Sequence, residues 1–133
     1  MVVEDDMPID HVSVGSNDIA RARAFYLAAL TPLGLRIVAE EAGRYCDFGI
    51  DGVAFSIETP VNGERASPGN GVHVCFKAAT RAAVAAFYDA ALAAGGRDAG
   101  PPGLRPNYGE HNYGAFVFDL DGNKIEACCH LPE

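Results

Sequence analysis

The stretch Gly114–Cys129 reads Gly-Ala-Phe-Val-Phe-Asp-Leu-Asp-Gly-Asn-Lys-Ile-Glu-Ala-Cys-Cys and holds the clearest structural signal in the chain. An aromatic and apolar run reaches Asp121-Gly122-Asn123, and a second short run returns from it. Asp-Gly between two such runs predicts a β-hairpin, because glycine readily takes the positive φ that a tight turn requires. Alternation along the returning strand places three side chains on one face, Lys124, Glu126 and Cys128. The carboxylate of Glu126 has no packing role there, so it is the first candidate site residue.

Composition predicts one globular domain over residues 1–133, with 49% apolar and 21% charged residues. No run approaches the about 18 apolar residues of a membrane span, and the acidic start Met1–Pro8 does not resemble a signal peptide. A net charge of −8 without any Lys/Arg cluster argues against nucleic acid and anionic membranes as partners. The four cysteines form no Cys-x-x-Cys, which favours reduced, mostly buried thiols in a cytoplasmic protein.

Two segments of the chain repeat one order of predicted elements. In the first, about residues 9–59, a strand with His11 precedes a helix over residues 19–33 and three short strands, Leu35–Glu40, Arg44–Gly49 and Val53–Thr59. Residues 60–70 are rich in Pro, Gly, Asn and charge and are predicted to form a linker. In the second segment, about residues 71–130, the elements are a strand at Gly71–Lys77, a helix capped by Thr80, a weak strand at Arg97–Ala99, a loop at Pro101–Asn112 and the hairpin.

Matching residues indicate that the two segments are an internal duplication. His73 follows His11 by 62 residues, and a Phe-Tyr pair inside each predicted helix keeps the same spacing. An Ile-Glu pair ends each half, with Glu58 taken as the counterpart of Glu126, and Asp-Gly precedes it both times. The sequence therefore predicts an α+β fold of two tandem modules, whose curved mixed sheet surrounds a concave cavity for a metal or ligand.

Two histidines and one carboxylate, His11, His73 and Glu126, together suggest a metal site. Alternation places His73 with Cys75 on the face opposite Val74 and Phe76, so the imidazole points away from the helix. A single histidine on such a face is more often a hydrogen-bonded structural residue, but duplicated histidines joined by Glu126 favour a ligand set. Imidazoles and a carboxylate are the ligands that a borderline divalent ion accepts, and three of them leave coordination positions open. Glu58 is a possible fourth ligand or a carboxylate that faces water.

Five motifs resemble the vicinal oxygen chelate superfamily of glyoxalases, extradiol dioxygenases and bleomycin-resistance proteins, over residues 9–130. They are Ile9–Val14, Ala22–Tyr26, Leu33–Leu35, Gly71–Phe76 and Phe118–Glu126, the last being the most specific. The resemblance implies two βαβββ modules, usually completed in a homodimer, with one divalent metal (Zn, Ni, Mn or Fe) in the cavity. It places the ligands at His11, His73 and Glu126, with Glu58 where glyoxalases have a fourth. The usual Asp-Pro-Asp-Gly of the hairpin reads Asp119-Leu120-Asp121-Gly122 here, which affects the entry to the turn.

The resemblance implies a small-molecule substrate whose two adjacent oxygens bind the metal. If Glu58 reaches the site it would act as a base, and Glu58 and Glu126 would serve glyoxalase-like lyase or isomerase chemistry, which we favour. If Glu58 faces water, the remaining two-histidine, one-carboxylate set is typical of a non-haem Fe(II) dioxygenase of the extradiol type. A metal-free, bleomycin-resistance-like binding protein is the alternative outside catalysis.

The predicted loop before the hairpin has residues suited to orient a substrate: Arg105, Asn107, Tyr108 and Tyr113. The alternative for any one of them is an ordinary exposed position on a loop. His111 in the same loop is a candidate proton relay. Cys75 and Cys128 share the face of the predicted ligands, where they either support the site or simply pack.

Overall fold

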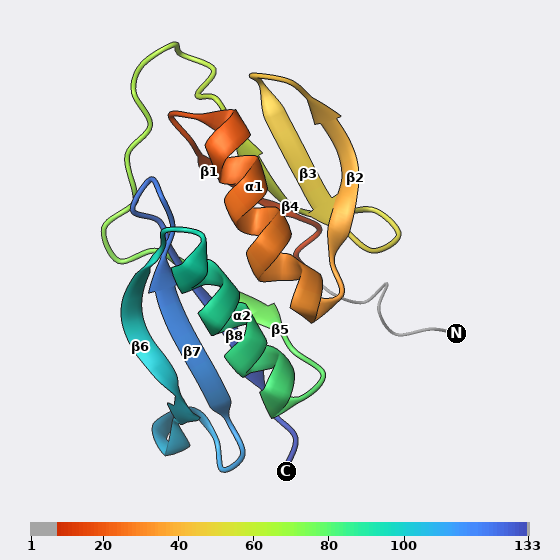
Figure 1. Cartoon of the computed structure of the whole chain (residues 1–133), viewed down its shortest axis with the longest axis vertical. Helices are drawn as coiled ribbons and strands as arrows, with labels where there is room; N and C mark the ends of the chain where they lie inside the picture. The colour runs from red at the N-terminus through yellow and green to blue at the C-terminus, as the bar shows by residue number, and fades with distance from the viewer. Residues whose placement is uncertain (1–7, 133) are drawn as a thin grey trace.

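The computed structural model describes residues 8–132, and both halves of the chain follow one element order (Figure 1). The first module consists of β1 (Val12–Gly15), α1 (Ile19–Leu30), the short 3₁₀ helix η2 (Thr31–Leu33), β2 (Arg36–Glu41), β3 (Tyr45–Gly49) and β4 (Val53–Glu58). The second consists of β5 (His73–Lys77), α2 (Arg81–Ala93), β6 (Arg97–Leu104), the 3₁₀ helix η3 (Pro106–Tyr108), β7 (Tyr113–Phe118) and β8 (Lys124–Cys129). The predicted α+β fold with two tandem modules is confirmed. The start Met1–Pro8, which is predicted not to be a signal peptide, lies outside the described residues except for Pro8.

The eight strands form two four-stranded sheets, one for each module. Their orders are β1-β4-β3-β2 and β5-β8-β7-β6, so each module places its last strand beside its first. In both sheets that pair is parallel, and the remaining pairs are antiparallel. Within residues 8–132, no helix has the length and apolar character needed to span a membrane.

Both helices begin where the sequence predicts. Asp18 Oδ1 accepts a hydrogen bond from the Arg21 N–H at 3.1 Å, and Thr80 Oγ1 accepts one from the Ala83 N–H at 3.0 Å. These side chains satisfy backbone donors that have no partner inside the first turn. α1 gives way to η2, which ends at Gly34 with φ 89°. Glycine takes that left-handed conformation without strain because it has no Cβ.

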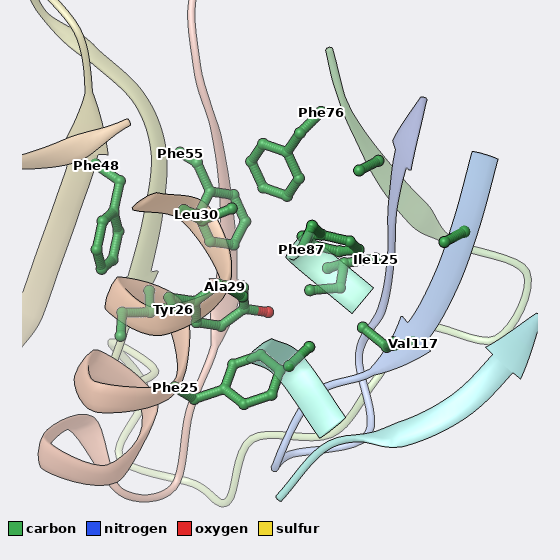
Figure 2. Close-up of a cluster of buried hydrophobic side chains, with 14 of the residues drawn as sticks. Phe25, Tyr26, Ala29, Leu30, Phe48, Phe55, Phe76, Phe87, Val117 and Ile125 are labelled. Atoms are coloured by element: carbon green, nitrogen blue, oxygen red, sulfur yellow. The ribbon is translucent and has the colours of Figure 1, made fainter. Parts of the chain in front are cut away.

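A shared hydrophobic core joins the two modules (Figure 2). The helices lie side by side, and each packs on the apolar face of its own sheet (Figure 1). α1 contributes Phe25 and Tyr26, both at most 1% exposed. Between the modules, the rings of Phe55 and Phe76 meet edge to face with centroids 5.0 Å apart. Because the helices cover these apolar faces, the polar side chains of both sheets lie on the opposite faces.

A polar contact at the Asp119–Asn123 turn also links the modules. The buried carboxylate of Asp119 accepts hydrogen bonds from the Tyr26 hydroxyl of α1 and from the backbone N–H groups of Asp121 and Asn123. The Asn123 side-chain amide donates to Asp119 Oδ2 at 2.9 Å and to the Gly15 carbonyl at 3.2 Å. The hairpin turn therefore fixes the end of β1 and the buried face of α1.

The weak strand predicted at Arg97–Ala99 is longer than expected, and this corrects the predicted loop Pro101–Asn112. β6 continues to Leu104, with Gly100 opposite Phe116 and Gly103 opposite Gly114. The prolines fall in the register shift between those two pairs. β6 is an edge strand, where a missing N–H costs little, so the prolines do not end it.

Gly49, at the irregularity between β3 and β4, has no room for a side chain. A Cβ at this position would lie 1.7 Å from the carbonyl oxygen of Gly52. We expect Gly49→Ala to lower the free energy of unfolding by about 1 to 3 kcal/mol, because the turn must rearrange. Gly52→Ala is the control, since its Cβ meets nothing within 4 Å. Equal urea midpoints for the two variants would contradict this prediction.

Candidate metal and substrate site

The clearest part of the site lies on the second sheet, where β5 and β8 run side by side. Ile125 and Ala127 point into the core, so alternation turns Glu126 to the opposite face. His73 Nε2 lies 3.1 Å from Glu126 Oε1. The carboxylate side chain is only 8% exposed, whereas the imidazole is 44% exposed. Two of the predicted ligands are therefore in direct contact, with the histidine at the opening and the acid beneath it.

Phe116 forms the adjacent wall of this half-site. It stands opposite Glu126 in the β7–β8 register, and its ring centroid is 5.7 Å from that of His73. Two cations lie over the same ring, Lys124 Nζ at 4.9 Å and the Arg105 guanidinium carbon at 5.7 Å. In a chain with a net charge of −8, two cations beside a candidate metal site are suited to an anionic group of a substrate.

Two thiols share this face, as alternation predicts. Cys75 Sγ and Cys128 Sγ are 3.2 Å apart, and His130 Nε2 is 3.5 Å from Cys128 Sγ. The hydrogen bond between the thiols raises the pKa of Cys75 above its usual range, and burial adds to the shift. The same hydrogen bond lowers the pKa of Cys128 to about 7, against the opposing effect of burial. Cys46 differs: burial in the core raises its pKa to about 11. All four described cysteines are free thiols.

The other two predicted ligands lie on the first sheet. His11 precedes β1 and Glu58 ends β4, and both line a cavity of about 610 Å³. Tyr45, Asp47 and Ser56 line the same cavity. His11 Nδ1 is 2.7 Å from Asp10 Oδ2, and its side chain is 55% exposed. His73 and Glu126 are not among the residues that line this cavity. One chain therefore presents the predicted ligands as two pairs on two sheets.

The strand register corrects the predicted equivalence of Glu58 and Glu126. In the second sheet His73 stands opposite Lys124, two residues before Glu126. In the first sheet Val12 stands opposite Phe55, so His11 is level with Ala54, two residues before Ser56. Ser56 is also as far from Gly52 as Glu126 is from Gly122. Ser56 therefore matches Glu126, and Glu58 lies one strand repeat further along the same face.

Sequence reasoning missed two polar residues of the first half-site. The Ser56 hydroxyl donates a hydrogen bond to Asp47 Oδ1 at 2.6 Å, which fixes the carboxylate of Asp47 in the cavity. Alternation in β3, with Cys46 and Phe48 buried, turns Asp47 to the open face. The same alternation that selected Glu58 would have found Asp47, and a count from Asp-Gly would have found Ser56.

The residues predicted to contact substrate are spread along the β6–β7 connection. Arg105 Nη2 donates to the Pro101 carbonyl at 2.7 Å, and the side chain borders the His73 half-site through Phe116. Asn107 and Tyr108 lie in η3 on the surface, and Tyr108 is 64% exposed. His111 Nε2 is 3.9 Å from Glu110 Oε2, and the Tyr113 ring lies 5.1 Å beneath the Arg81 guanidinium. None of these five residues is among those that line the cavity of His11 and Glu58.

Comparison with known proteins gives one family and several solved structures with the same fold. Residues 8–127 match the glyoxalase/bleomycin resistance protein/dioxygenase superfamily. The chain is 35% identical to a glyoxalase/bleomycin resistance protein from Albidiferax ferrireducens T118, over 94% of this chain and 100% of that one, with a TM-score of 0.83. A lactoylglutathione lyase from Agrobacterium tumefaciens shares the fold at 22% identity and TM-score 0.62, over 91% and 92% of the two chains. TioX from Micromonospora sp. ML1 does so at 19% identity and TM-score 0.62, over 94% and 100%. No curated protein matches the chain.

Proposed function

Because the chain belongs to the glyoxalase/bleomycin resistance protein/dioxygenase superfamily, we propose that it is a metal-dependent enzyme acting on a small molecule with two adjacent oxygens. The observation that carries this proposal is the contact between His73 Nε2 and the buried Glu126 carboxylate. A buried carboxylate is costly without a partner, and one beside an open imidazole is an arrangement that a cation would stabilise.

The donor set fits a first-row divalent ion such as Zn²⁺, Ni²⁺, Mn²⁺ or Fe²⁺. His73 and Glu126 would hold the ion from the second sheet, and His11 would hold it from the first. When bound, the ion would supply Lewis-acid stabilisation of charge that develops on the substrate oxygens.

We further propose that two copies of the chain complete the site. His11 lies in a cavity on the first sheet, whereas His73 and Glu126 lie on the second. A symmetric dimer can place the first sheet of one copy against the second sheet of its partner, and it then forms two equal sites. This arrangement joins both pairs of ligands and leaves the core between the helices unchanged.

Glyoxalase-like lyase or isomerase chemistry agrees best with the residues around the ligands. Glu58 shares the cavity with His11 but stands one strand repeat beyond the position that matches Glu126. There its carboxylate is suited to accept a proton from a carbon beside a carbonyl group. Lys124 and Arg105, both over the Phe116 ring, would orient an anionic group of the substrate.

The register favours a second candidate, ring-cleaving oxygenation. In the first module the position equivalent to Glu126 is Ser56, which has no carboxylate. The ligands at equivalent strand positions are then two histidines, His11 and His73, and one carboxylate. That set is typical of non-haem Fe(II) oxygenases. Elemental analysis of the purified protein, counting only the metal that is lost in His73→Ala, separates the candidates: Fe(II) favours oxygenation, Zn or Ni favours proton transfer, and no metal favours a binding protein.

Mixed dimers test the shared site. His11→Ala and His73→Ala are each expected to lose most bound Mn²⁺, whereas a dimer with one copy of each, purified through two different tags, is expected to bind about half the wild-type amount of Mn²⁺. In that dimer one site keeps both histidines and the other keeps neither. If each site lay within one chain, the mixed dimer would be as empty as its parents, because neither chain has both histidines. That result would contradict a shared site. His111→Ala is the control, since that exposed-loop histidine contacts Glu110 instead.

A further inference from the structure

We propose that Cys75, Cys128 and Glu126 form a separate site for a thiophilic cation such as Zn²⁺ or Cd²⁺. The three side chains lie on one face of the neighbouring strands β5 and β8, where Cys75 is level with Glu126 and Lys77 with Cys128. This site shares Glu126 with the metal centre proposed above, but it does not depend on the proposed reaction, since the two thiols are not part of that ligand set.

The distances suit a small ion. One ligand atom from each of the three residues lies within 4.8 Å of the other two, and the two sulfurs are 3.2 Å apart. Tetrahedral zinc with bonds of about 2.3 Å to sulfur requires ligand atoms about 3.8 Å apart. The cluster can therefore reach this geometry by small side-chain movements, without a change in the backbone.

The surroundings supply an entrance and further donors. Cys75 is exposed, whereas Cys128 and Glu126 are each 6% exposed, so an ion can enter from the Cys75 side. His130 Nε2 lies 3.5 Å from Cys128 Sγ. Asn112 is 5% exposed, and its Oδ1 atom has no hydrogen-bond partner among the described residues. A buried amide oxygen in that state is costly, and a cation nearby would satisfy it.

Gly114 leaves the space into which these oxygens point. It stands opposite Cys128 in the β7–β8 register. A Cβ at this glycine would lie 3.0 Å from Glu126 Oε2 and 3.8 Å from Asn112 Oδ1. Glu126 thus turns Oε1 toward His73 and Oε2 toward Gly114, the residue opposite Cys128. The carboxylate can contribute one oxygen to each site.

Packing does not account for the thiol pair. Cys46 and Cys129 belong to the hydrophobic core, whereas Cys75 and Cys128 lie on the opposite face, beside a carboxylate. Binding would form two sulfur–metal bonds and release two thiol protons to solvent, with no change in oxidation state. Thiolates select soft and borderline ions over Mg²⁺, Ca²⁺ and Mn²⁺.

Cadmium titration of the reduced protein tests this site, because cadmium bound to thiolate absorbs in the ultraviolet through charge transfer. We expect one equivalent of Cd²⁺ per chain to produce this absorption. Cys75→Ser and Cys128→Ser should each weaken binding at least about tenfold and remove most of the absorption. Cys129→Ala and His73→Ala are the controls and should retain it. Absorption that persists in both serine variants, or that is absent from the wild type, would overturn the proposal.

Alkylation gives a second test, one that leaves all three proposed ligands unchanged. With Zn²⁺ present, Cys75 should react with iodoacetamide at least about tenfold more slowly, as measured by peptide mass spectrometry. An unchanged rate would overturn the site. The outcome is independent of the proposed enzyme, because His73→Ala abolishes the metal site of that enzyme and should leave this protection in place.

Discussion

Replacing Asp119 with alanine is expected to lower the free energy of unfolding by about 3 to 5 kcal/mol, one of the largest effects of any single substitution in this chain. Asp119 is 5% exposed and accepts four hydrogen bonds from three residues of two modules. Its removal leaves the Tyr26 hydroxyl, in a residue with 0% exposure, without an acceptor. Guanidinium unfolding followed by circular dichroism measures the change.

The Tyr26 hydroxyl keeps its proton at neutral pH, because its pKa lies above the ordinary value. Burial raises the pKa of Tyr26 well above its ordinary value, and the Asp119 charge raises it further. The hydroxyl therefore remains a donor to Asp119. Tyr26→Phe, which removes one donor and leaves the other three hydrogen bonds to Asp119, should cost only about 1 to 2 kcal/mol.

Asp98 provides a matched control for Asp119. Its carboxylate also accepts a tyrosine hydroxyl, that of Tyr88 at 3.0 Å, and a backbone N–H, that of Gly100 at 2.9 Å. Because Asp98 is exposed, water replaces those partners, and Asp98→Ala should cost less than about 1 kcal/mol. Equal losses for the two alanine variants would show that burial at the turn is not the cause.

Much of this fold could be predicted because its signals are local. Asp18 and Thr80 cap their helices through bonds to residues three positions away, and Gly122 forms its turn with φ 89°. Alternation alone identified the face that carries Glu126. The repeat of the Phe-Tyr pair reflects a real equivalence, since Phe25 and Phe87 are both buried in the shared core.

The rest depends on pairing between segments that are far apart in sequence. The local Ile-Glu repeat matches Glu58 to Glu126, whereas the register of β1 against β4 matches Ser56 to Glu126. A shift of two residues keeps the side chain on the same face, so alternation cannot detect it. The extent of β6 likewise depends on its pairing with β7, which local composition rich in proline and glycine conceals.

The site was the harder prediction. The sequence argues that His11, His73 and Glu126 meet, but within the chain the core between α1 and α2 orders the modules so that the ligands form two pairs. No local signal reports how two modules pack. The position of Arg105 beside Phe116 is also a consequence of the folded β6–β7 pair.

Glu126→Gln is expected to weaken binding of Mn²⁺ at least about a hundredfold, the largest effect predicted for the site. Glutamine has the size of glutamate but lacks the charge, so the packing around β8 is preserved and the best ligand is lost. Isothermal titration with Mn²⁺, an ion that thiolates do not select, measures this site without the cysteine cluster.

Glu58→Gln makes the same chemical change on the first sheet and is the matched comparison. If Glu58 acts as a proton acceptor beside the ligands, Glu58→Gln should bind Mn²⁺ with an affinity within about tenfold of the wild type. Only the turnover of the variant should then be reduced. Two equally weakened variants would instead make Glu58 a fourth ligand. Retention of metal by Glu126→Gln, with an unchanged melting temperature, would contradict the proposed centre, because the buried carboxylate beside His73 is the observation on which it rests.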